Sequence, residues 1–190
     1  DVTHKNQSNL AEKQYESEQE EVESFEPQNE NERSFVSLLK MFKDNFSTNF
    51  EAETIVSQLQ KLSLKVVKAK KENPANTSMT YIRTYDSLPG TRYFHAQVME
   101  STNGSFIQHI SFEFEKGKDA FQRAEAAVKD MFPKLNLQKS QENYRLWDFE
   151  EDYIVWIKIL DKDDIQADPF NAYDVSDIGT IRVVMELEIH

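Results

Sequence analysis

The chain has 190 residues, a net charge of −12 and no cysteine. An acidic chain is a poor partner for nucleic acid or an anionic membrane surface, because both are bound mainly through cationic side chains. The lack of cysteine excludes disulfides, a thiol nucleophile and thiolate metal sites, and no apolar run approaches the roughly 18 residues of a transmembrane helix.

The first 33 residues differ in composition from the rest of the chain. They hold ten acidic and three basic residues and few large apolar side chains. Such a segment cannot bury enough apolar surface to offset the entropy lost on ordering. We therefore expect an acidic flexible arm over 1–33 and a single α+β domain over 34–190.

The chain begins with Asp1 rather than Met. This start predicts that an N-terminal segment was removed, as happens when a signal peptide is cleaved. We expect an extracytoplasmic location (periplasmic, surface or secreted). A lipid anchor carried by the removed segment is one form of attachment that fits.

Two helices are expected after the arm. The apolar residues of the first recur with the period of one helical face: Phe35, Leu38, Leu39, Phe42 and Phe46. Thr48 and Glu51 have the spacing of a capping box, which predicts the start of the second helix. We expect that helix to end near Leu62 and a short strand to follow it.

The remaining elements alternate between strands and one further helix. Strands are predicted over 78–85, 92–100 and 105–115, the last two joined by the turn dipeptide Asn103-Gly104. A helix is predicted over 118–132, a hairpin over 144–149 and 153–160, and a last strand over 181–189. This order predicts an antiparallel sheet built from two strand meanders with helices packed on one face. A doubled unit of one helix and three strands is one hypothesis for the topology.

His95 and His109 lie on partner strands of the Asn103-Gly104 hairpin, and histidine is the usual general base and metal ligand. A two-residue turn places Thr102 opposite Ser105. In that register the two histidines point to opposite faces of the sheet and cannot share a metal. A one-residue change in register would reverse this expectation.

The segment 161–177 holds the highest local concentration of oxygen donors: Asp161, Asp163, Asp164, Asp168, Asp174 and Asp177. Several carboxylates together suit a hard cation such as Ca²⁺. The spacing does not match an EF-hand, because the sixth position from Asp161 is Gln166 rather than glycine. The alternative is a solvated connection between strands, although a loop of this length is often functional.

Aromatic residues form the second candidate site. The side chains considered for a ligand or partner surface are Trp147, Tyr153, Trp156, Phe170 and Tyr173. Alternation along the strands sends some of them to each face of the sheet, and one face must be core. Exposure of Trp156 and Ile154 would favour a partner surface or ligand groove.

Motifs for nucleophilic serine chemistry and for phosphate binding are absent from the sequence, and its four glycines are scattered singly. The sequence therefore favours a non-enzymatic binding or interaction module with no cofactor except a possible Ca²⁺. One alternative is a metal-assisted hydrolase that uses 161–177 with His95 or His109. Another is a structural subunit that dimerises through the last strand, should that strand lie on an open sheet edge.

Overall fold

The computed structural model describes residues 24–45, 51–62, 64–73, 76–84, 94–102, 104–114, 116, 119–149, 152–167 and 173–188. Its helices are α1 (Glu30–Asn45), α2 (Ala52–Lys61), α3 (Ala120–Met131), α4 (Lys162–Ala167) and the short 3-10 helix η1 (Val175–Asp177). Its strands are β1 (Val66–Asn73), β2 (Thr77–Thr84), β3 (Phe94–Ser101), β4 (Gly104–Phe114), β5 (Asn136–Gln141), β6 (Tyr144–Phe149), β7 (Tyr153–Ile159) and β8 (Ile181–Leu187).

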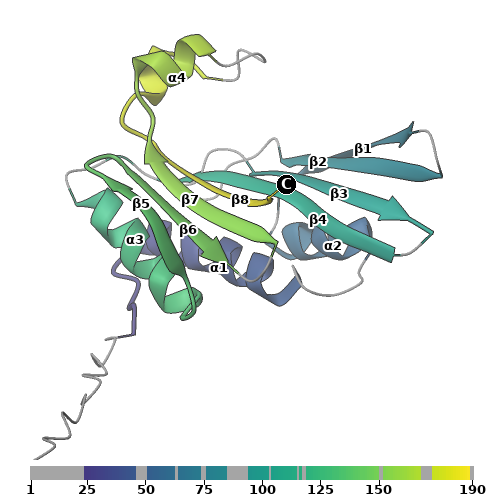
Figure 1. Cartoon of the computed structure of the whole chain (residues 1–190), viewed down its shortest axis with the longest axis horizontal. Helices are drawn as coiled ribbons and strands as arrows, with labels where there is room; N and C mark the ends of the chain where they lie inside the picture. Colours follow the sequence, from purple (N-terminus) through teal and green to yellow (C-terminus); the bar gives the residue numbers. More distant parts are fainter. Residues whose placement is uncertain are drawn as a thin grey trace, which may run out of the picture.

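The strands form one eight-stranded sheet in the order β1-β2-β3-β4-β8-β7-β6-β5 (Figure 1). Every neighbouring pair is antiparallel. Strands β1–β4 make one meander and β5–β8 the other, and the two meanders meet where β4 pairs with β8. The predicted α+β class, with two meanders in one antiparallel sheet, is confirmed.

The doubled unit is longer than the predicted helix and three strands. In each half a helix precedes four strands; the first half has α2 in addition, and the second has α4 and η1 between β7 and β8. The unpredicted strand of the second half is β5, whose sequence NLQKSQ is exposed at all six positions. An edge strand that buries no side chain shows no alternation of apolar and polar residues, so its sequence carries no strand signal.

Helix α1 begins at Glu30, four residues before the predicted domain boundary at residue 34. The side-chain oxygen of Asn29 accepts a hydrogen bond from the backbone N–H of Glu32 at 2.9 Å, which caps the first turn. Phe25 packs against the core from just before this turn. Residues 24–33, which composition assigns to the arm, therefore contact the domain, while the prediction of a flexible arm for 1–23 lies outside the described residues.

Helix α2 begins at Ala52, with Glu51 as its N-cap and no side-chain capping bond. The predicted capping box also needs Thr48, which lies outside the described residues. The helix ends at Lys61 and β1 starts at Val66. The predicted change from helix to strand in this region is confirmed.

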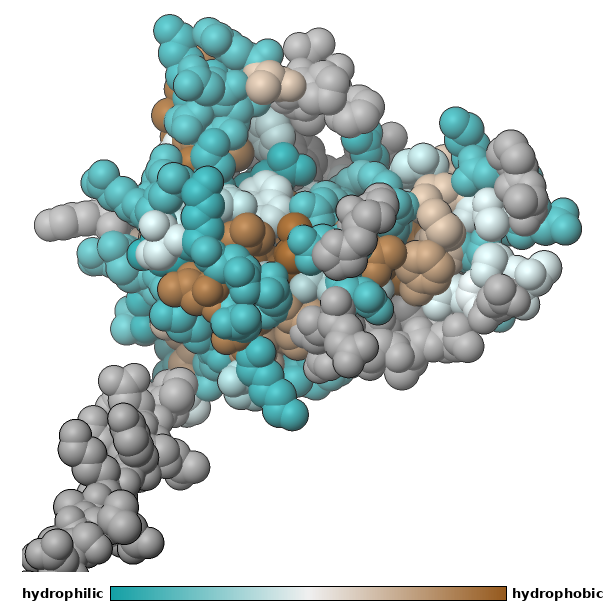
Figure 2. Space-filling view, viewed as in Figure 1, coloured by the Kyte–Doolittle hydropathy of each residue, from teal (hydrophilic) through white to brown (hydrophobic). Residues whose placement is uncertain are grey.

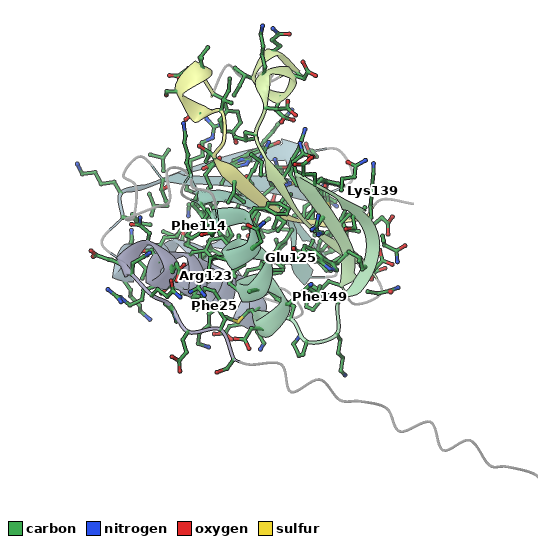
Figure 3. All side chains as sticks on the ribbon, turned by 90° about the vertical axis from the view of Figure 1, so that its left-hand side faces the viewer. Phe25, Phe114, Arg123, Glu125, Lys139 and Phe149 are labelled. Carbon is green, nitrogen blue, oxygen red and sulfur yellow. The ribbon has the colours of Figure 1, made fainter. Side chains whose placement is uncertain are left out.

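Helices α1, α2 and α3 lie on one side of the sheet (Figure 3), while α4 and η1 connect β7 to β8 and project beyond the ends of these strands (Figure 1). The core fills the space between the sheet and the three long helices. Its largest fully buried side chains include Phe35, Phe42, Phe112, Phe114, Phe132 and Trp147. The stripe predicted for the first helix is confirmed from Phe35 to Phe42, and Phe46 lies outside the described residues.

The last strand, β8, lies at the centre of the sheet between β4 and β7. Its backbone is paired on both sides from Ile181 to Glu186. The condition for a dimer through this strand, an open edge, is therefore not met, because the edges of the sheet are β1 and β5, and a structural subunit stays a prediction.

Candidate functional site

The candidate site lies on the open face, which we define as the side of the sheet opposite α1, α2 and α3. Along β8, Ile181, Val183 and Met185 point into the core, so Arg182 and Glu186 point to the open face. Figure 2 views this face and shows apolar side chains exposed within a hydrophilic surround.

His95 and His109 share the open face, which corrects the prediction of opposite faces. Their ring centroids are 5.7 Å apart. Two departures from the predicted register explain this: Ser101 rather than Thr102 starts the turn, and a bulge at Gln108 adds one residue to β4. The bulge decides the result, because one extra residue moves every later side chain of the strand to the other face.

A hydrogen-bonded network joins three strands on the open face. Glu186 on β8 accepts from the indole N–H of Trp156 on β7 at 3.0 Å, and its second oxygen lies 3.2 Å from Nδ1 of His109 on β4. The hydrogen bond with His109 holds the pKa of Glu186 below its usual range, although burial opposes this shift. Glu186 therefore stays ionised and fixes the orientation of the Trp156 ring.

His95 lies beside this network and is held neutral. Burial lowers its pKa to about 4, and the positive charges of His109, Arg83 and Arg182 add to the effect. A neutral imidazole on this face can accept or donate a hydrogen bond without adding to the local charge.

This pKa predicts a loss of stability in mild acid. The unfolded chain binds a proton on His95 near pH 6.5, whereas the folded chain binds it only near pH 4. Stability should therefore fall as the pH decreases between these two values, by about 2 kcal/mol once partial exposure is allowed for.

Urea unfolding of the native chain and of His95→Asn at pH 7 and pH 4.5 measures the effect. The variant should lose less stability between the two pH values. An equal loss in both proteins would show that His95 titrates normally.

Arg182 lies between two aromatic rings at the base of the α4–η1 projection. Its guanidinium carbon is 5.7 Å from the ring centre of Trp156 and 5.6 Å from that of Tyr173. The hydroxyl of Tyr173 donates to Glu113 at 2.7 Å. The Nε of Arg182 is buried and, within the described part of the chain, has no hydrogen-bond partner. These contacts bring together two predicted site residues, Trp156 and Tyr173.

Beside this cluster is a partly exposed apolar group that we call the open-face patch: Tyr144, Leu146, Ile154 and Trp156. Leu146 is directly opposite Trp156 in the β6–β7 register. The Tyr144 and Trp156 ring centroids are 6.2 Å apart. Ile154 precedes Trp156 by two residues on the same face. Sequence reasoning did not select Leu146, because its exposure depends on which face of the hairpin α3 covers.

Two of the predicted surface aromatics lie on the side of the helices instead. Trp147 is 1% exposed in the core, so its assignment to a partner surface is wrong. Tyr153 is partly buried against the core, and its hydroxyl donates to the carbonyl of Ile107 at 2.7 Å. Alternation along β6 and β7 sends these side chains to the face opposite Trp156. Phe170 lies outside the described residues.

Asp161 and Asp164 are bonded to Lys158 on β7 and to backbone groups of their own segment. Lys158 donates to Asp164 at 2.6 Å and lies 3.5 Å from Asp161. Asp161 also accepts from the backbone N–H groups of Asp163 and Asp164 at 2.9 and 3.0 Å.

The other two described aspartates of this segment, Asp174 and Asp177, form a reciprocal capping box at η1. Asp168 lies outside the described residues. Within the part of the chain that the structure describes, no group of three or more His, Asp or Glu side chains is placed to hold a metal ion. The cation site and the hydrolase that would use it stay predictions.

Comparison with protein-family models, curated proteins and solved structures finds no match to this chain. None of the described helices has the length and apolar content needed to cross a membrane.

Proposed function

We propose that this chain is a non-enzymatic protein-binding module and that the open-face patch is its recognition surface. One observation carries the proposal: Tyr144, Leu146, Ile154 and Trp156 are partly exposed together on a sheet face that none of the three core helices covers. A sheet face left to solvent ordinarily carries polar side chains. A contiguous group of aromatic and aliphatic side chains there is typical of an interaction site.

The chemistry of the patch supports a protein partner. Tryptophan, tyrosine and arginine are the residue types that most often dominate protein–protein affinity. Trp156 contacts both Tyr144 and Arg182. The hydrogen bond to Glu186 fixes the Trp156 ring before binding, which reduces the entropy lost when a partner docks.

Site-specific photo-crosslinking in the native cells tests this proposal. A photoreactive phenylalanine analogue replaces Leu146 on the patch, and the control replaces Ser37, which is exposed on α1 at the opposite side of the domain. We expect one discrete crosslinked protein from position 146 and none from position 37. Adding Trp156→Ala should reduce that product more than about tenfold, as expected for a residue central to an interface.

Two results would contradict the proposal. One is the same set of products from both positions, since this would reflect random encounters. The other is a product from position 146 that Trp156→Ala leaves unchanged.

A further inference from the structure

The charged side chains around the open-face patch differ in whether they have a hydrogen-bond or salt-bridge partner among the described residues. The acidic side chains on the open face of strands β4, β6, β7 and β8 are Glu113, Asp148 and Glu186, and each accepts a hydrogen bond from a neighbouring side chain. Glu113 accepts from Tyr173, and Asp148 accepts from the amide of Gln138. Glu186 accepts from Trp156 and contacts His109. Each acid of this surface therefore has at least one hydrogen-bond donor within the chain.

Two cations beside the patch have no such acidic partner among the described residues. Arg182 contacts the rings of Trp156 and Tyr173, and Lys139 lies 5.5 Å from the ring centre of Tyr144. Lys139 is on the edge strand β5, opposite Leu146 in the register (Figure 3). The third cation, Lys158, is bonded to Asp164. The patch is thus flanked by two cations, on β8 and β5, that form no salt bridge with another described residue, although Arg182 lies opposite Glu113 in the register and its charge helps to lower the pKa of Glu186.

Because these acids have hydrogen-bond donors and the two cations have no acidic partner among the described residues, we infer that the partner binds through an acidic protein segment that also carries apolar residues. The apolar side chains of the segment contact the patch, and its carboxylates contact Arg182 and Lys139. This inference rests on the proposed function and names its partner chemistry. A guanidinium stacked on ring faces keeps N–H groups in its plane for carboxylate oxygens. A basic segment would instead meet like charges at short range on Arg182 and Lys139.

The net charge of −12 does not prevent this contact. Charges separated by more than about 8 to 10 Å are largely screened at physiological ionic strength. Arg182 and Lys139 adjoin the patch, so they act at short range and influence which residues the patch accepts. The same screening predicts that affinity falls as salt is added.

A displayed library of random 12-residue peptides tests the inference without a known partner. Peptides selected on the full chain are sorted by whether they lose binding to Trp156→Ala. We expect the Trp156-dependent peptides to combine aromatic or aliphatic residues with an excess of Asp and Glu over the starting library. Their affinity should fall about tenfold for the double variant Arg182→Gln, Lys139→Gln in low salt.

The matched control is the double variant Arg33→Gln, Lys134→Gln. It removes one arginine and one lysine that are both exposed and distant from the open face, on α1 and just after α3. This control should bind the selected peptides as the native chain does. Equal losses for the two double variants would overturn the inference, because the effect would then come from net charge alone.

The remaining outcomes separate this inference from the function on which it rests. Trp156-dependent peptides that are neutral or basic would overturn the acidic partner and leave the binding surface standing. Selected peptides that all bind Trp156→Ala normally would overturn both, since the patch would then not be a recognition surface.

Discussion

Replacing Trp147 by alanine is expected to lower the free energy of unfolding by about 4 kcal/mol, the range for removing a large aromatic side chain from a well-packed core. Trp147 is 1% exposed and belongs to the cluster between the sheet and the helices. The surrounding strands β5 and β7 are held by their own ladders, so they cannot close the cavity. Urea unfolding followed by circular dichroism measures the loss.

Trp156→Ala is the control for this prediction. It removes the same side chain from the neighbouring strand, but from the partly exposed open face. It should cost clearly less than Trp147→Ala. Equal losses for the two variants would show that the open face is as tightly covered as the core, which would contradict the proposed surface.

Replacing Arg123 by methionine should destabilise the fold by about 3 kcal/mol, because a buried carboxylate would lose its partner. Arg123 on α3 donates to both oxygens of Glu32 on α1, at 2.7 and 2.5 Å. Glu32 is 3% exposed. The same guanidinium donates to the carbonyl of Glu26 and covers the ring of Phe25. One side chain therefore ties the helix pair to the segment before α1.

The pH dependence of this loss follows from the ionisation of Glu32. The bond from Arg123 lowers the pKa of Glu32, so its contribution is complete above the unfolded value of 4.5 and disappears as the pH falls through the lowered value. The difference in stability between the native chain and Arg123→Met should therefore shrink at pH 3.

The double variant Glu32→Leu, Arg123→Met should recover most of the stability at pH 7, since it removes both buried charges together. No recovery in the double variant would show that the loss comes from the contacts with Phe25 and Glu26 instead.

Much of the fold could be predicted because most elements bury one face. Along β8, alternation correctly placed Ile181, Val183 and Met185 inward and Arg182 and Glu186 outward. Helix α1 was predicted from the stripe that it buries. The edge strand β5 could not be predicted, because all six of its side chains are exposed, and its backbone pairs only with β6 among the described strands.

The candidate site was harder to predict because it depends on register and on the choice of face. Alternation predicted that the aromatic side chains of this hairpin divide between the two faces, but it did not show that Trp147 and Trp156 are on opposite faces or that α3 covers the face of Trp147. The bulge at Gln108 has no signal in the local sequence, yet it brings His109 to the same face as His95. Trp156 and Tyr173 were identified as candidates, whereas the link between them through Arg182 comes from tertiary packing.

The pairing of β4 with β8 has a consequence for how the chain is made. His109 and Glu186, which are partners in this ladder, are 77 residues apart in the sequence. At ordinary translation rates of about 5 to 20 residues per second, the second strand follows the first by roughly 4 to 15 seconds. During that interval the first meander has an unpaired edge at β4, beside the apolar side chains of Ile110 and Phe112. The nascent chain therefore needs protection from aggregation until β8 closes the centre of the sheet.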